Sequence, residues 1–247
     1  MKIALLLPSR SRIQENKRFL DSLQNTIENP ESVVVYYGLD SDDSEREELT
    51  GLLVNPKYTK FKTHITVYPY SEKFPGLGVL WNKLAQVCDC EIFAMVGNDM
   101  VFRTRGWDTH ILQEFSEPQN LKLVYCNDDM RGPGNKFYWA EPLAVNSFIH
   151  RKYYDLLGYY VQESFKHGYH DTYLHNVFTK LGRIVYRSDI HISHLHYSFG
   201  EMPIDETAKR LKSAYNECQA DRLWNEIQPK LNNEVEVLKK YIHETNS

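Results

Sequence analysis

With 247 residues, 42% of them hydrophobic, the chain is long enough to bury a sizeable core in one large domain. Its 29 basic and 33 acidic side chains give a formal charge of -4, which argues against general attraction to a phosphate backbone but leaves room for a local basic patch. The apolar runs are too short for a signal or membrane helix, and the 4 cysteines lack zinc-site spacing, so we expect a cytoplasmic protein with reduced thiols and no membrane insertion.

The first half of the chain alternates short apolar runs with amphipathic stretches, a pattern typical of βαβ units around a mostly parallel sheet. We expect strands over 3–7, 32–37, 62–68 and 92–96. We expect helices over 9–23 with Ser9 as N-cap, over 44–53, and over 75–87. The carboxyl ends of such strands share one edge of the sheet, where open α/β sheets bind ligands.

The second half predicts a strand over 121–126, a mobile polar loop over 127–136, helices over 151–157 and 171–181, and an extended segment over 184–196. A charged helical tail follows from Asp205. Its apolar stripe of Val235, Leu238 and Ile242 predicts that the tail packs on the body or on a second subunit.

Asn98 and Asp99 follow the apolar run 92–96, where a buried strand is expected to end. A carboxylate there suits Mg²⁺ or Mn²⁺, which take few protein ligands and complete their shell with phosphate and water oxygens. A negatively charged chain needs such a cation, or local basic groups, to hold a nucleoside diphosphate. Alternatively, the two side chains cap a turn by bonding to nearby backbone groups.

Three histidines, His191, His194 and His196, lie in the extended segment near the end of the body. Residues two apart in a strand share a face, so His194 and His196 are expected to point the same way. Neutral imidazole suits Mn²⁺ and can also donate to phosphate, which makes these two candidate metal ligands together with Asp99. A single half-buried histidine more often has a backbone partner, the interpretation we favour for His191.

Several short motifs follow one another in a specific order. They are Pro8-Ser9-Arg10, the acidic stretch 39–43, Gly76-Leu77-Gly78 with Trp81-Asn82, and Gly97-Asn98-Asp99. Further along come 102–108, 170–174, and His194-Leu195-His196 with Asp205-Glu206-Thr207. This order, over about residues 1–210, resembles a family 2-like glycosyltransferase of the small bacterial and phage type. One departure is that Gly97 or Asn98 stands where the family's Asp-x-Asp motif has its first acid.

The resemblance implies an α/β protein with a GT-A-type nucleotide-binding fold, a mostly parallel central sheet flanked by helices, and a C-terminal helical extension. It implies one catalytic domain over 1–204, with a nucleotide-sugar half over 1–110 and an acceptor half over 111–204. The helical tail would occupy 205–247.

The matching motifs also imply a set of donor-binding residues: Pro8, Ser9, Arg10, Arg12, Asp40, Asp42, Gly78, Asn82, Asn98 and Asp99. Pro8 to Arg10 would border the base or ribose, and Asp40 would accept a hydrogen bond from uracil or its equivalent. Asp42 and Asp43 could instead form a solvated acidic turn. Asn82 could equally be a helix-surface amide.

Asp171 matches the family's later acidic motif, and the resemblance implies that it is the general base. An acceptor hydroxyl hardly ionises near neutral pH, so its attack on an anomeric carbon needs a carboxylate within hydrogen-bond reach. Asp171 could also be the N-cap of the following helix, where its pKa would be lowered and it would be a weaker base.

On the acceptor side, Tyr138 and Trp139 offer ring faces for stacking on a sugar or base, while Trp107 and His170 fall within matching motifs. The acceptor could be a growing glycan, a small molecule, or a hydroxymethylated base in DNA, since related phage enzymes glycosylate such bases. For DNA, a local basic edge could come from Lys166, Arg183, Arg187, Lys209, Arg210 and Lys212, although helical solvation explains 209–212 equally well.

The expected activity is therefore a Mn²⁺- or Mg²⁺-dependent hexosyl or pentosyl transfer from a nucleoside-diphosphate sugar, with UDP-sugar the preferred donor and inversion expected. It would take place in the cytoplasm of a bacterium or a phage-infected host. Two alternatives stay open. One is a nucleotide- or carbohydrate-binding module without turnover, suggested by the missing acid, and the other is a nucleotidyltransferase, which would need two close carboxylates.

Overall fold

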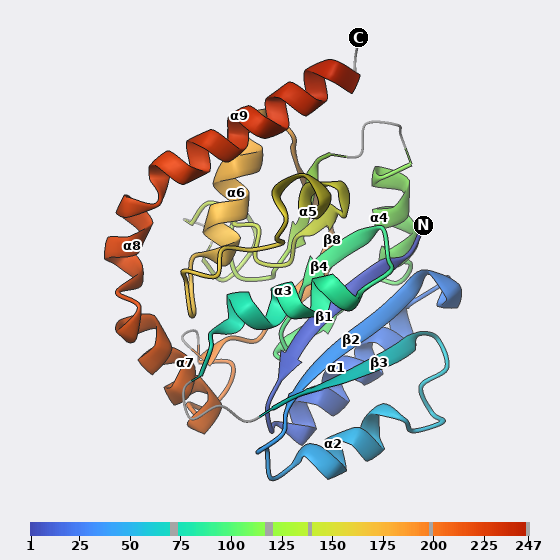
Figure 1. Cartoon of the computed structure of the whole chain (residues 1–247). Helices are drawn as coiled ribbons and strands as arrows, with labels where there is room; N and C mark the ends of the chain where they lie inside the picture. The colour runs from blue at the N-terminus through green and yellow to red at the C-terminus, as the bar shows by residue number, and fades with distance from the viewer. Residues whose placement is uncertain (70–73, 117–120, 138–139, 198–199, 246–247) are drawn as a thin grey trace.

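The computed structural model describes residues 1–69, 74–116, 121–137, 140–197 and 200–245, and Figure 1 shows a twisted sheet with helices on both faces. The sheet has 8 strands in the order β3-β2-β1-β4-β7-β6-β8-β5. The strands are β1 (Ile3–Ser9), β2 (Val33–Asp40), β3 (Lys62–Tyr68), β4 (Ile92–Met95), β5 (Met100–Phe102), β6 (Leu123–Asn127), β7 (Phe148–His150) and β8 (Ile184–His194).

The helices alternate with the strands in the first half and dominate the end of the chain. They are α1 (Ile13–Thr26), α2 (Arg46–Leu53), α3 (Leu77–Val87), α4 (Trp107–Glu114), α5 (Lys152–Leu157), α6 (His170–Leu181), α7 (Glu206–Glu217), α8 (Ala220–Glu226) and α9 (Gln228–Thr245), with a 3-10 turn at Pro30–Ser32. No described helix is both long and apolar enough to cross a membrane.

Four parallel strands, β3-β2-β1-β4, form the first half of the sheet, as the alternation of elements predicted. Successive side chains of a strand point to opposite faces, and β1 divides accordingly. Leu6 belongs to the core under α3, α6 and α9, whereas Leu5 and Leu7 belong to the core under α1, α2 and α4. Burial on both faces explains why β1, β2 and β4 read as largely apolar runs, whereas β3 at the edge of the sheet is mostly exposed or half-buried and carries polar residues.

The second half of the sheet is mixed, and its pairing brings distant segments to the strand ends of the first half. β7 runs antiparallel to both β4 and β6, while β6 and β8 are parallel. β5 pairs antiparallel with β8, with Met100 opposite His194. The turn after β4 therefore lies beside the carboxyl end of β8.

The C-terminal helices wrap one side of the body, as Figure 1 shows. α9 packs along α6 and α5, and its Leu231, Val235 and Leu238 are buried in the core on that face. Of the apolar stripe expected of the tail, Val235 and Leu238 are buried and Ile242 packs partly buried against the same core, so the stripe packs on the body of the same chain.

Most expected elements occur near their predicted bounds, with one clear error in the first helix. α1 begins at Ile13 rather than at Ser9, because β1 extends to Ser9 and the chain then turns through Ser11 and Arg12, both in the left-handed region. Ser9 is therefore no N-cap. Its hydroxyl instead bonds to the side chain of Asn16 inside the fold.

Candidate functional site

A cavity of about 210 Å³ opens at the carboxyl ends of β1, β2 and β4. Pro8 and Ser9 come from the first strand, Asp40 from the second, and the turn 97–99 from the third. The opposite wall is built by the loop and first turn of α6, by the end of β8, and by α7. The sheet edge predicted from the sequence is thus the floor of this cavity.

Asp99 and His194 meet on the cavity floor because β5 pairs with β8. Leu195 donates its backbone N–H to the carbonyl oxygen of Asp99 at 2.8 Å, and Nε2 of His194 lies 3.6 Å from Oδ2 of Asp99. Burial alone would raise the pKa of Asp99, but His194, with weaker contributions from His196 and Arg12, lowers it to about 2. Asp99 is therefore an anion at neutral pH.

The two histidines differ in their ionisation. Burial opposes protonation of His194, but the charge of Asp99 and a hydrogen bond to it raise the pKa of His194. Burial, and then the neighbouring His194, lowers the pKa of His196 to about 4. Their ring centroids are 5.2 Å apart and both side chains line the cavity, although the backbone leaves the strand at His194.

Gly97 has a steric role in the turn that carries Asp99. A Cβ on Gly97 would collide with Oδ1 of Asp99, so a side chain at this position would force the carboxylate to move. Glycine at position 97 thus leaves room for the carboxylate beside His194.

The possible metal ligands beside Asp99 suit a divalent cation that fills most of its coordination shell with phosphate and water oxygens. The half-buried carboxylate of Asp99 and the imidazole of His194 face each other, and the buried Nδ1 of His194 has no hydrogen-bond partner among the described residues. Within those residues no group of three or more His, Cys, Asp or Glu side chains could hold a metal by itself. The residues present fit Mg²⁺ or Mn²⁺ bound together with a diphosphate.

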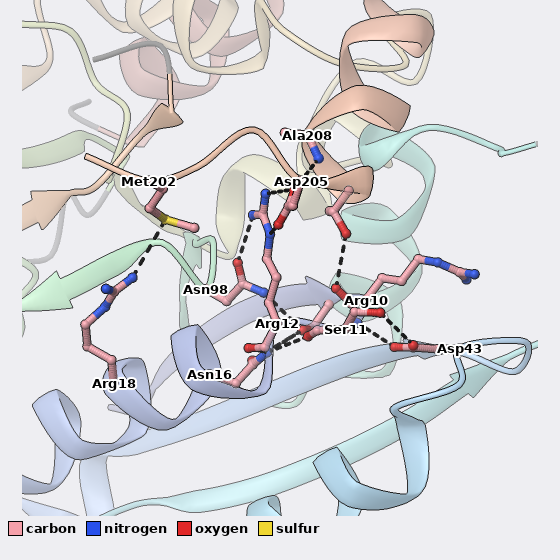
Figure 2. Close-up of polar contacts among 12 residues, drawn as sticks. Arg10, Ser11, Arg12, Asn16, Arg18, Asp43, Asn98, Met202, Asp205 and Ala208 are labelled. Atoms are coloured by element: carbon pink, nitrogen blue, oxygen red, sulfur yellow. Dashed lines mark hydrogen bonds and ion pairs between the residues drawn. The ribbon is translucent and has the colours of Figure 1, made fainter. Parts of the chain in front are cut away.

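Asn98, at the position of the missing acid, is engaged by the protein itself. Its Oδ1 accepts a hydrogen bond from Arg12 at 3.3 Å, and its Nδ2 donates to Ser9 at 3.4 Å. Arg12 in turn forms a two-pronged ion pair with Asp205 at 2.6 and 2.8 Å, drawn in Figure 2. Through Arg12, the amide therefore links the turn after β4 to the start of α7.

Asp205 was not assigned a site role from the sequence, yet it organises the cavity's outer wall. Its side chain caps α7 by accepting from the backbone N–H of Ala208 at 2.7 Å. Thr207, Arg210 and Leu211 of that helix line the cavity. The signal in the sequence was an Asp immediately before a helix-forming stretch, which marks a cap but not its position in space.

Asp40 lies at the end of β2 and faces two arginines. Its Oδ2 accepts from Arg10 at 3.0 Å and from Arg210 at 2.9 Å. Arg10 also forms a bidentate pair with Asp42 at 2.7 and 3.0 Å, which lowers the pKa of Asp42. Asp42 lies outside the cavity lining and holds Arg10 from the far side, rather than forming a purely solvated turn.

Asp43, named in the same acidic stretch, is buried. It accepts hydrogen bonds from the backbone N–H of Ser11 at 2.6 Å and from the hydroxyl of Ser11 at 2.9 Å, as Figure 2 shows. It thereby ties the segment before α1 to the loop after β2.

Asp171 faces the cavity from the first turn of α6, across from Asp99. It is not the N-cap, since Tyr169 occupies that position with a left-handed backbone, and Asp171 accepts from the N–H of its neighbour Thr172. His170 also lines the cavity. Its Nε2 lies 3.0 Å from the carbonyl oxygen of Phe165, and burial lowers its pKa to about 3.

His167 is a cavity residue that the sequence motifs did not reveal. It lies on the loop before α6, and burial lowers its pKa against the opposing charges of Asp171 and Asp99. Its buried Nδ1 has no hydrogen-bond partner among the described residues. His167 is therefore a neutral imidazole with an unsatisfied nitrogen close to both carboxylates.

Three residues expected at the site lie elsewhere. Trp107 is fully buried in the core, packed against Phe102 and Phe148, because the first turn of α4 faces the sheet. Asn82 is buried and binds the backbone of 160–161, which makes it a packing amide rather than a surface or donor group. Gly78 lies behind the cavity wall, where a Cβ would approach the carbonyl oxygen of Gln162 to 2.7 Å.

The remaining expectations concern Tyr138 and Trp139, the basic edge for DNA, and His191. Tyr138 and Trp139 lie outside the described residues. The basic edge expected for DNA is largely neutralised, because Lys166, Arg187, Lys209 and Arg210 each lie within 2.6 to 2.9 Å of a carboxylate oxygen. His191 pairs with Asp129 at 2.8 Å, so its partner is a side chain 62 residues away in sequence rather than the backbone group expected of it.

Comparison with known proteins gives similarity in structure without similarity in sequence. No family model and no curated protein matches the chain. S. aureus TarS 1–349 in complex with UDP matches at 13% identity over 77% of this chain, with a TM-score of 0.57. The mannosyltransferase PcManGT from Pyrobaculum calidifontis, in complex with GDP-Man and Mn²⁺, matches at 12% identity over 79%, with a TM-score of 0.60.

The matched regions cover 60% of that TarS chain and 57% of PcManGT, so this chain spans less than two thirds of either. At such identity the likeness establishes the fold. The chain has a GT-A-type α/β fold with a C-terminal helical extension, as the order of its motifs predicted.

Proposed function

We propose that this protein is a glycosyltransferase that moves a hexose or pentose from a nucleoside-diphosphate sugar to an acceptor hydroxyl, with UDP-sugar as the first donor to test. The observation that carries the proposal is the pairing of Asp99 with His194 on the cavity floor, with Asp171 on the facing wall. The fold adds support, because TarS and PcManGT were solved with UDP and with GDP-Man. The order of the motifs supports a family 2-like type.

In this proposal the donor lies along the strand ends. Pro8 and Ser9 border the nucleoside, and Asp40 accepts from the base once Arg10 or Arg210 yields one of its present contacts. Those arginines are then close enough to receive phosphate oxygens. Arginine suits this role because its planar fork matches phosphate geometry.

Asp99 and His194 would hold Mn²⁺ or Mg²⁺, with His196 as a further neighbour, and binding of the ion would displace the proton that Asp99 favours on His194. When bound, the ion would neutralise the charge that develops on the leaving diphosphate. The low pKa of Asp99 keeps the carboxylate available as a ligand at neutral pH.

Asp171 would accept the proton of the acceptor hydroxyl as its oxygen bonds to the anomeric carbon. The bond from that carbon to the diphosphate oxygen breaks on the opposite side, and its electrons leave with the diphosphate. A single displacement of this kind inverts the anomeric configuration. His167, neutral and unsatisfied beside Asp171, is placed to hydrogen-bond the incoming acceptor.

The test is release of nucleoside diphosphate from a panel of sugar nucleotides, with and without Mn²⁺. We expect slow Mn²⁺-dependent hydrolysis of one donor, abolished by Asp99→Ala and unaffected by Asp155→Ala, which removes an exposed carboxylate of α5 that pairs with Arg151 and does not line the cavity. Binding without release in every case would indicate a non-catalytic module instead. Pyrophosphate release from a nucleoside triphosphate would indicate a nucleotidyltransferase.

A further inference from the structure

A second groove lies on the outer face of α1, against β5, away from the donor cavity. Its lining includes Gln14, Lys17, Arg18 and Asp21 of α1, and Arg103 just after β5. Positions 14, 17, 18 and 21 recur at helical spacing, so they form one face of α1. Arg12 precedes the same helix but faces the donor cavity, about 9 Å along the axis from Arg18 at 1.5 Å per residue.

The groove concentrates positive charge in a chain whose net charge is negative. Among the described residues, no carboxylate lies within ion-pair distance of Lys17, Arg18 or Arg103. The one acid in the lining, Asp21, is already paired with Lys57 at 2.5 Å and accepts from the hydroxyl of Tyr58. Three cations therefore face the groove without a carboxylate at ion-pair distance, although the charge of Lys17 helps to lower the pKa of Asp21 and Arg103 donates to the hydroxyl of Ser193 at 3.0 Å.

Of these three cations, Arg18 is the one with a buried donor atom that lacks a partner among the described residues. Its Nε is buried without a hydrogen-bond partner among the described residues, and one terminal nitrogen donates to the sulfur of Met202 at 3.7 Å, drawn in Figure 2. A sulfur atom is a weak acceptor, and leaving a buried donor unpaired is costly. Arg10 and Arg12, by contrast, are each held by carboxylates in bidentate geometry.

We propose that this groove is a binding site for a phosphate-type oxyanion, distinct from the donor site. A tetrahedral oxyanion carries enough acceptors and charge to engage Arg18, Lys17 and Arg103 together, and the side-chain amide of Gln14 adds a neutral donor. The ligand can be free phosphate or a phosphodiester within a longer chain.

The experiment measures binding of inorganic phosphate and of a short thymidine oligonucleotide by isothermal titration calorimetry on the full chain. Arg18→Gln is expected to weaken binding about tenfold or more, the scale of a lost charged hydrogen bond. The matched control is Arg222→Gln, which removes the same charge from α8, where Arg222 pairs with Glu226 at 2.9 Å. Lys17→Gln, at an exposed position where misfolding is not expected, should also weaken binding, though less.

Binding of inorganic phosphate that Arg18→Gln weakens would support a free-phosphate ligand. Binding of the oligonucleotide alone, or far more tightly than phosphate and falling with salt, would support a phosphodiester chain. Absence of binding by both probes, or equal losses in Arg18→Gln and Arg222→Gln, would overturn the proposal. Release of nucleoside diphosphate from a sugar nucleotide is measured in a separate assay. The proposed oxyanion site and the proposed transferase activity can therefore be contradicted independently of each other.

Discussion

At the scale of single residues, the chemistry of the donor cavity depends on which partner each acid meets. Asp99 is anionic because the charges of His194 and Arg12 lower its pKa more than burial raises it. Asp43 instead accepts hydrogen bonds from Ser11, and Asp42 accepts them from Arg10. The sequence could name these acids as candidates, but their partners lie 30 to about 100 residues away. Only the tertiary structure shows which of these acids faces the cavity and which are bonded to other parts of the protein.

Asp171→Asn tests the base directly. The amide keeps the shape of the side chain but cannot take a proton, so we expect transfer to fall on the order of 10²-fold or more. The affinity for the sugar nucleotide, measured by titration calorimetry, should stay near wild type because Asp171 lies on the first turn of α6, across the cavity from the strand ends. Transfer at the wild-type rate would remove Asp171 from the mechanism.

Gly97→Ala tests the space beside Asp99. The added Cβ collides with the carboxylate of Asp99. Mn²⁺-dependent release of nucleoside diphosphate should therefore fall by at least about tenfold while the protein stays folded. Gly51→Ala is the matched control, since a Cβ there meets nothing within 4 Å and lies in helix α2. This control should keep full activity and gain about 0.4–1 kcal/mol of stability, measured by chemical denaturation.

At the scale of elements, α7 links the C-terminal extension to the cavity. Its start is fixed by the cap and ion pair of Asp205, and Arg210 reaches Asp40 at the end of β2. Helix boundaries could be approximated from periodicity and capping residues. The placement of α7 over the strand ends depended on contacts across 170 to 193 residues of sequence.

Asp205→Ala should destabilise this arrangement. It removes the helix cap, about 0.5–2 kcal/mol by itself, and leaves Arg12 without its carboxylate. We expect a lower Tm in differential scanning calorimetry. Glu206→Ala, one residue further on and paired only with exposed Lys209, is the control and should leave the Tm within about a degree. Equal effects of both changes would contradict the role of Asp205.

At the scale of the whole molecule, α9 is attached to the body through a buried polar group as well as apolar packing. Glu234 is 6% exposed and contacts the hydroxyls of Tyr159 and Tyr173 and the amide of Gln162. Burial raises the pKa of Glu234 from 4.5 to about 8. The folded protein therefore retains a proton that the unfolded chain has lost.

This difference in proton binding predicts how stability changes with pH. Between pH 4.5 and about 8 the folded state binds more protons at Glu234, so its contribution to the free energy of unfolding decreases as pH rises and levels off above about 8. Glu234→Gln should flatten this slope in urea denaturation series. Glu236→Gln, exposed on the same helix beside Lys239, should leave it unchanged. A wild-type slope in Glu234→Gln would contradict the assignment.

The sequence by itself determined the alternation of strands and helices, the apolar strands of a doubly covered sheet, and the acidic side chains at the strand ends. These features are local, because periodicity and turn chemistry depend on residues a few positions apart. The order of the motifs correctly predicted the GT-A-type fold.

Only the tertiary structure decided which side chains share a cavity. It buried Trp107 and Asn82, moved the start of α1 to Ile13, and brought Asp205 to Arg12 and Arg210 to Asp40 at the strand ends. The physical reason is that strand pairing and helix packing join residues far apart in sequence, and periodicity carries no information about which surfaces will meet.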